Sequence, residues 1–151
     1  MCEIPREVKD PEKIVRVLLE DHLNDSGTAI KPRAFRSKID EVSVIRADYR
    51  DANFCKEKAK ELEATAPSKY VGLAVLVVGS VRKVGSEVYD SREIYCGHAH
   101  ISHNIPAAAP NEPPSASQLK ELDERTKLLR DMAQFHKDPD PTTSSWTGTQ
   151  F

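Results

Sequence analysis

The feature that most constrains the fold is a long apolar segment in the middle of the chain, from Tyr70 to Arg82. A strand with one face in water shows alternating apolar and polar residues, whereas this segment is apolar almost throughout. Its apolar members are Val71, Leu73, Val75, Leu76, Val77, Val78 and Val81. We therefore predict a strand over residues 70–82 that is covered on both faces and lies at the centre of a sheet.

The residues that follow predict two further strands. Residues 83–86 read Lys-Val-Gly-Ser, a composition that favours a hairpin connection. Residues 87–89 would then form a short strand, and residues 93–103 a longer one. Because consecutive strands joined by short turns usually pair, we predict an antiparallel meander that runs from residue 70 through residue 103.

Two amphipathic segments are available to cover this sheet. One lies near residues 52–65, and the other lies near residues 116–135 after a capping box from Ser115 to Gln118. The side chains that the second helix should bury are Leu122, Leu129 and Met132. The sequence thus predicts an α+β fold, in which an antiparallel sheet centred on residues 70–82 is covered by two helices.

The first element of the chain fits two interpretations. Asp10-Pro11-Glu12 is a typical helix start, and Ile14, Val17 and Leu18 follow at helical spacing. The β-branched residues of the same stretch leave a strand as the alternative. Further along, residues 42–46 predict a short strand.

The chain length of 151 residues fits one ordinary domain. We expect a single globular domain over residues 1–136 and a flexible C-terminal tail over residues 137–151. The tail is rich in Pro, Thr and Ser, and it should be mobile unless Trp146 and Phe151 dock on the domain.

Charge and composition exclude several classes of function. The 22 basic and 24 acidic residues give a net charge of −2, which does not favour nucleic acid as a partner. The longest apolar stretch, residues 71–79, is much shorter than the roughly 20 residues of a membrane helix. The charged N-terminus has no apolar core of a signal peptide. The three cysteines are odd in number and widely spaced, so we expect no disulfide framework and a reducing, cytoplasmic setting.

Histidines concentrate in one segment, residues 94–104, which holds three of the five in the chain. Because side chains alternate across a strand, His98 and His100 should share one face, opposite Ala99 and Ile101. Their imidazoles would then lie about 6 to 7 Å apart along the strand. Two imidazoles at that spacing can hold a metal ion, straddle a phosphate or act in proton transfer.

One hypothesis for this segment is a metal site. A zinc-like transition metal needs three or four ligands, and Cys96, His98 and His100 supply up to three of them. The remaining ligand is not indicated by sequence spacing, and a lone His-x-His pair is a weak signal. An ordinary sheet face, on which the histidines bond to neighbouring residues, is the alternative.

A second hypothesis is chemistry on a phosphate ester. His100-Ile101-Ser102 resembles the His-x-Ser/Thr element of two-histidine phosphoesterases, but that family needs two such elements on separate strands and this chain has one. A hydrolase or transferase that uses His98 and His100 would need arginines to grip the anion. The arginines that we assign to anion binding are Arg33, Arg36 and Arg82.

The sequence contains no complete catalytic motif. We therefore favour a small soluble binding or regulatory module that recognises a protein partner or an anionic ligand, such as a phosphate-containing small molecule. The alternatives are a small phosphate-ester hydrolase or transferase built on His98 and His100, and a metal-binding protein that uses the same histidines.

Overall fold

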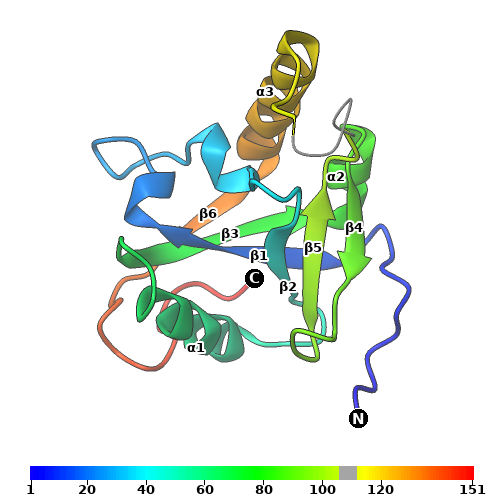
Figure 1. The fold of residues 1–151 in the computed structure, drawn as a ribbon. Coiled ribbons are helices and arrows are strands. Elements are labelled where there is room, and N and C mark those ends of the chain that lie inside the picture. Colours follow the sequence, from blue (N-terminus) through cyan, green and yellow to red (C-terminus); the bar gives the residue numbers. More distant parts are fainter. Residues whose placement is uncertain (106–111) are drawn as a thin grey trace.

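A computed structural model describes residues 1–105 and 112–151 of the chain. Over these residues the protein has an antiparallel six-stranded sheet of order β4-β5-β2-β1-β3-β6 (Figure 1). The strands are β1 (Lys13–Leu19), β2 (Val42–Arg46), β3 (Tyr70–Val77), β4 (Glu87–Asp90), β5 (His98–Ser102) and β6 (Gln134–Lys137). The helices are α1 (Ala52–Glu63), α2 (Val78–Lys83) and α3 (Ala116–Met132), with the short 3-10 helices η1 (Glu20–His22) and η2 (Pro32–Phe35). The predicted α+β fold with an antiparallel sheet is confirmed.

Strand β3 is covered on both faces, as its apolar sequence predicts. Leu73 and Val75 belong to the core on one side of the sheet, and Ala74 and Leu76 to the core on the other side. The predicted strand is nevertheless too long, because the chain turns into helix α2 at Val78. Val78 and Val81 are both buried by this helix, because residues three apart lie on the same face of a helix.

The predicted meander from residue 70 through residue 103 is wrong in its first step. β4 and β5 pair as expected, but β5 then pairs with β2, whereas β3 lies between β1 and β6. Helix α2 causes the difference, because it connects β3, which lies next to the β6 edge, with β4 at the opposite edge. The last strand is also shorter than expected, since regular pairing covers residues 98–102 only.

The first element is strand β1, so the helix that its start signals predict is wrong and the strand alternative is right. β1 pairs with β3 along its whole length, from Lys13 to Leu19. Its side chains alternate between the two cores: Ile14 and Leu18 face one, and Val15 and Val17 face the other. Burial on both faces favours the β-branched residues of this stretch in a strand.

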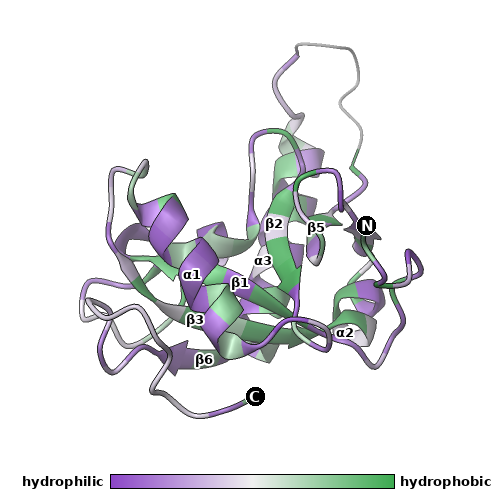
Figure 2. Cartoon of the chain, turned by 90° about the horizontal axis from the view of Figure 1, so that it is seen from below, coloured by the Kyte–Doolittle hydropathy of each residue, from purple (hydrophilic) through white to green (hydrophobic). Residues whose placement is uncertain are grey.

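The two faces of the sheet are covered by different elements. Helices α2 and α3 and the 3-10 helix η2 lie on one face, with Phe35, Val81 and Leu129 in the core beneath them. Helix α1 covers the other face through Ala52, Cys55 and Ala59. Figure 2 shows α1 with hydrophilic and hydrophobic residues side by side, as expected of a helix that lies on a sheet.

Helix α3 packs less closely than its sequence predicts. Leu129 is fully buried and Leu122 is half-buried, but Met132 is 40% exposed, so the expectation that Met132 is buried is wrong. In Figure 1 the first part of α3 projects beyond the sheet. The helix ends at Met132, because the residues from Gln134 onward pair with β3 as strand β6.

The C-terminal segment, expected to be a flexible tail over residues 137–151, lies against helix α1 and the sheet. Trp146 is buried in the core beneath α1, and its ring contacts that of Phe151 at a centroid distance of 6.1 Å. The buried Lys56 ammonium binds the Asp138 carboxylate at 3.0 Å and the Asp140 and Ser145 carbonyls. Trp146 and Phe151, the two aromatic residues of this segment, therefore both dock on the domain.

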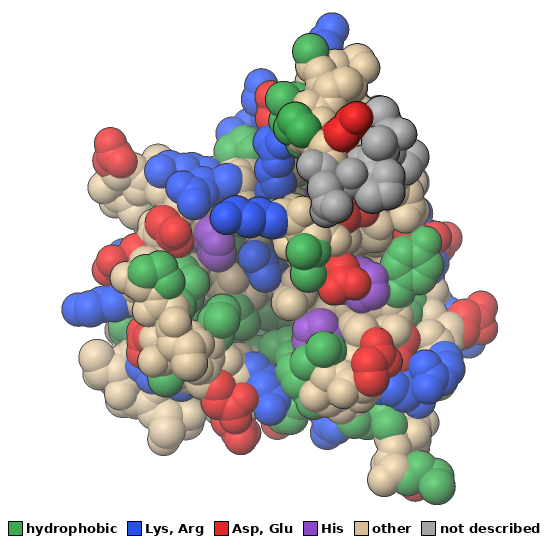
Figure 3. All heavy atoms as spheres, in the orientation of Figure 1, with side chains coloured by type: hydrophobic (Ala, Val, Ile, Leu, Met, Phe, Trp, Pro, Cys, Tyr) green, Lys and Arg blue, Asp and Glu red, His purple; other side chains and the backbone are tan. Residues whose placement is uncertain are grey.

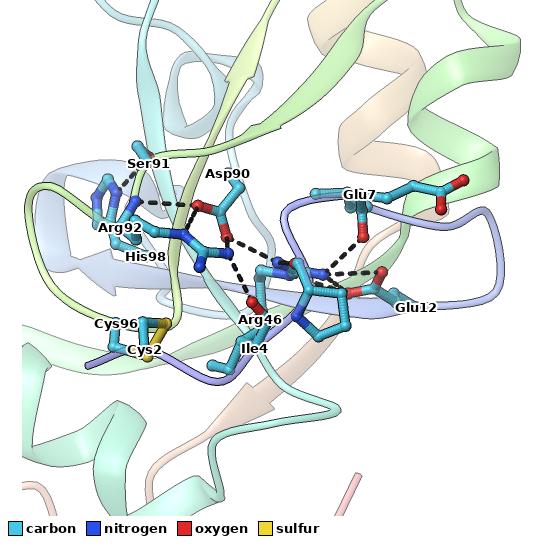
Figure 4. A network of polar contacts seen from close by, with 12 residues as sticks. Cys2, Ile4, Glu7, Glu12, Arg46, Asp90, Ser91, Arg92, Cys96 and His98 are labelled. Atoms are coloured by element: carbon cyan, nitrogen blue, oxygen red, sulfur yellow. Dashed lines mark hydrogen bonds and ion pairs between the residues drawn. A yellow bond between two sulfur atoms is a disulfide. The ribbon is translucent and has the colours of Figure 1, made fainter.

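The N-terminal segment is held by a buried arginine and a disulfide (Figure 4). The Arg46 guanidinium is fully buried and pairs with Glu12 at 2.9 Å and Asp90 at 2.7 Å. It also donates to the carbonyl of Glu7 at 3.0 Å. Cys2 and Cys96 form a disulfide across 94 residues of sequence, a pair that the number and spacing of the cysteines did not predict. The cysteines therefore no longer support the expected reducing setting.

We predict that Trp146→Ala lowers the free energy of unfolding by about 3 to 5 kcal/mol, because it opens a cavity in the core beneath α1. Leu128→Ala is the matched control: it truncates an apolar side chain that is 49% exposed, so it should cost much less. Urea unfolding followed by circular dichroism measures both. Equal stability of the Trp146→Ala variant and the wild type would show that the tail is not part of the domain.

Candidate functional site

The candidate site begins with a divergence between two neighbouring strands. β1 pairs with β2 at only two positions, Ile14 with Arg46 and Val15 with Ile45. In Figure 1, β1 and β3 lie across the view while β2, β5 and β4 lie upright in it, so the strands separate beyond this point. The separation leaves the backbone of Ser43 in β2 without a partner on β1.

The side chain of Arg16 fills this separation. Its Nε donates to the Ala34 carbonyl at 2.9 Å, and its Nη1 donates to the Ser43 carbonyl at 3.1 Å. The guanidinium therefore replaces the strand pairing that β1 and β2 lose. It ties three parts of the chain together: β1, β2 and the end of η2.

Arg16 also lines a hollow of about 300 Å³ on the face of the sheet that helix α1 covers in part. Figure 3 shows a hollow near the middle of this side of the molecule, with hydrophobic side chains on its floor and histidine beside it. Its apolar lining consists of Val15, Val17, Val44, Ile45, Leu62, Ile94 and Tyr95. Its polar lining consists of Arg16, Ser43, Lys58, Glu61 and His98.

The positive charge of Arg16 is not neutralised by an acid. Among residues 1–105 and 112–151, no carboxylate lies within ion-pair distance of its guanidinium. Burial lowers the pKa of Arg16 from 12.5 to about 10, so the side chain stays protonated near neutral pH. Burial, followed by the positive charge of Arg16, lowers the pKa of the neighbouring His22 to about 4.

At the rim of the hollow, Lys58 and Glu61 compensate each other. The Lys58 ammonium lies 3.2 Å from the Glu61 carboxylate, one turn along α1. The same ammonium lies 4.5 Å from the centre of the Tyr95 ring, within range of a cation–π contact. The rim is therefore close to neutral, and the net charge of the hollow comes from Arg16.

His98 and His100 lie on one face of β5, which confirms the prediction from alternation. Their Nδ1 atoms both contact the Ser91 hydroxyl, at 2.6 Å for His98 and 3.3 Å for His100. Ser91 has one hydroxyl proton, so it donates to one ring and accepts from the other. When the Ser91 hydroxyl donates along the shorter contact, Nδ1 of His98 is the acceptor. The ring proton of His98 is then on Nε2, from which it can be donated to a ligand.

Burial, and then the nearby His100, lower the pKa of His98 below its usual 6.5. His98 is therefore a neutral hydrogen-bond donor at neutral pH, and it adds no charge to the hollow. Its ring also meets that of Tyr95 edge-on at a centroid distance of 5.0 Å. These contacts fix the orientation of the imidazole.

The structure does not bring the proposed metal ligands together. Cys96 is bonded to Cys2, so its sulfur is not the thiolate that a metal needs; its prediction as a ligand is wrong in this oxidised state. Over the described residues, no three His, Cys, Asp or Glu side chains are grouped to hold an ion.

The three arginines assigned to anion binding lie away from the two histidines of β5. Arg33 and Arg36 line another depression, beside α3, which does not include His98 or His100. Arg33 lies 3.7 Å from Asp21, and Arg36 lies 3.2 Å from Asp123. Arg82 is held by two carboxylates at 2.6 Å, those of Asp10 and Glu87.

Ser91 and His98 lie as close together as a catalytic serine and its general base, but they share no other feature of such a pair. Ser91 is only 4% exposed, and its hydroxyl lies between two imidazoles. A nucleophile must reach a substrate carbonyl or phosphoryl group, and this hydroxyl is enclosed. We therefore assign Ser91 the role of orienting the two rings.

Sequence reasoning missed Arg16, the residue on which this site depends. The signal was present, because Arg16 is the one charged residue inside the apolar stretch Ile-Val-Arg-Val-Leu-Leu of β1. A charge in the middle of a strand with two buried faces needs a partner or a ligand. If the stretch is interpreted as an amphipathic helix, Arg16 lies on the solvent-exposed face and needs no partner.

Comparison with known proteins adds no information about this site. A scan against models of protein families, a search of curated proteins and a search of solved structures each found no match. In the part of the chain that the structure describes, none of the helices has the length and apolar character needed to cross a membrane.

We predict that stability falls in mild acid. Burial is the main cause that lowers the pKa values of His22, His98 and His103 below 6.5 in the folded protein. The unfolded chain then binds more protons below this pH, so the free energy of unfolding rises with pH in that range. The stabilisation is present above pH 6.5 and is lost as the pH falls toward about 4, the pKa of His22.

Urea unfolding at a series of pH values tests this dependence. His22→Asn should flatten the slope, because an amide oxygen can accept the Leu19 N–H bond that the imidazole accepts at 3.0 Å, but it does not titrate. Equal slopes for the variant and the wild type would contradict the role of His22.

Proposed function

We propose that this protein is a binding protein for a small organic anion, which occupies the hollow above Arg16. One observation carries the proposal: a guanidinium that lines a ligand-sized hollow has no carboxylate partner among the described residues. Hollows that bind small molecules have volumes from about 300 Å³ and place few polar groups among apolar ones. The volume and the lining of this hollow fit that description.

The hydrogen bonds of Arg16 leave room for a ligand. A guanidinium carries five N–H groups, and the protein carbonyls of Ala34 and Ser43 engage Nε and Nη1. No described residue accepts a bond from Nη2. A carboxylate or phosphate oxygen there would make a charge-assisted bond, and the Nε2 proton of His98 can add a second contact from the wall.

The energetics favour an anion over a neutral ligand. Desolvating a cation without a counter-charge is unfavourable, as the lowered pKa of Arg16 indicates. An anion in the hollow would restore that lost solvation. The net charge of −2 makes the attraction local to this site, which favours a small ligand over a long polyanion.

We predict that Arg16→Gln weakens the binding of benzoate, used as a probe anion, by at least about tenfold, since bonds to a charged group contribute about 1.5 to 3 kcal/mol. Arg33→Gln is the matched control, because that guanidinium is 61% exposed and lies outside the hollow. NMR titration of backbone amides measures both affinities, and the wild type should show saturable shifts in β1, β2 and β5.

Arg16→Lys separates loss of binding from loss of folding. It keeps the charge but loses the planar fork, so its affinity should fall between those of the wild type and Arg16→Gln. Thermal melts establish that each variant is folded. The proposal is wrong if folded Arg16→Gln binds benzoate as the wild type does, or if Arg33→Gln weakens binding equally.

A further inference from the structure

The mouth of the hollow carries exposed apolar side chains from two different elements. Leu62 of α1 is 41% exposed, and Ile94 of the β4–β5 connection is 65% exposed; both line the hollow. Large exposed apolar residues that border a concave site typically mark a binding surface. Here they continue the apolar floor outward, away from Arg16.

The floor between the mouth and Arg16 is also apolar. Val17 and Ile45 are buried in the core beneath α1, and both line the hollow. Tyr95 contributes a ring whose hydroxyl has a raised pKa, mainly because of burial, so it stays neutral. A ligand that contacts Arg16 in this hollow therefore also contacts hydrocarbon.

The charge of the hollow favours a ligand with one anionic group. Lys58 and Glu61 neutralise each other at 3.2 Å, so the single positive charge of Arg16 is left to balance the ligand. Nucleotides carry two or more negative charges near neutral pH, and inorganic phosphate is a mixture of its monoanion and dianion. A monoanion with an apolar body fits the hollow better than either of them.

We infer that the ligand is an apolar monocarboxylate, a short fatty acid or a molecule of similar shape, with its carboxylate on Arg16 and its hydrocarbon between Leu62 and Ile94. This inference rests on the proposed function and adds the ligand class. The volume of about 300 Å³ suits a hydrocarbon chain of moderate length and excludes a diacyl lipid inside the hollow.

The test is a calorimetric titration of the full chain with acetate, butanoate and octanoate. Each methylene that becomes buried should tighten binding by about fourfold, which corresponds to about 0.8 kcal/mol. Octylamine has the same hydrocarbon with the opposite charge, and it should bind at least about tenfold more weakly than octanoate.

The outcomes separate this inference from the proposed function. Equal affinity for acetate and octanoate would overturn the ligand class but not the proposed anion site. Tighter binding of inorganic phosphate than of octanoate would do the same. Octylamine binding as tightly as octanoate would show an apolar groove in which Arg16 has no role, and it would overturn both. Failure of every anion to bind would also overturn both.

A pair of surface variants locates the hydrocarbon. Ile94→Ser should reduce octanoate affinity by at least about threefold, because it removes an apolar contact at the mouth. Leu128→Ser changes a side chain of α3 that is 49% exposed and does not line the hollow, so it should leave the affinity unchanged. Equal affinities of the two variants would place the hydrocarbon elsewhere and contradict the inference.

Discussion

Strand β1 pairs with β3 over its full length but with β2 at only two positions, and the form of the sheet follows from this difference. The strands on the β2 side turn away, and the opening between β1 and β2 needs a polar group to satisfy the carbonyls that face it. Arg16 supplies that group through its bonds to Ala34 and Ser43. The same side chain therefore holds the sheet together and adds a positive charge to the lining of the hollow.

The fully buried cations of the molecule show what is unusual about Arg16, which is half-buried. Arg46 is fully buried and pairs with two carboxylates, those of Glu12 and Asp90, which fixes the N-terminal segment. Lys56 is equally buried and pairs with Asp138, which fixes the C-terminal segment. In both cases the chain provides the counter-charge, as the cost of a buried charge requires. Arg16 lacks such a partner among residues 1–105 and 112–151, and the hollow beside it is open to a ligand.

Local patterns predicted the parts of the fold that local burial determines. The apolar run gave β3, and the period of two placed His98 and His100 on one face. The same patterns failed where the rest of the chain decides: the strand ends at Val77 because the chain enters α2, and Cys2 forms a disulfide with Cys96 across 94 residues of sequence. The candidate site is one of the features that local patterns do not predict. Arg16 gains its role from the divergence of β2, which no spacing within β1 reveals.

The central claim is that the charge of Arg16 is available to an anion, and anomalous diffraction from a crystal soaked in iodide tests it most directly. We expect an iodide peak inside the hollow, within hydrogen-bond distance of the Arg16 guanidinium and near Nε2 of His98. Peaks only at exposed arginines such as Arg33, with the hollow closed by the Glu61 carboxylate on Arg16, would contradict the account.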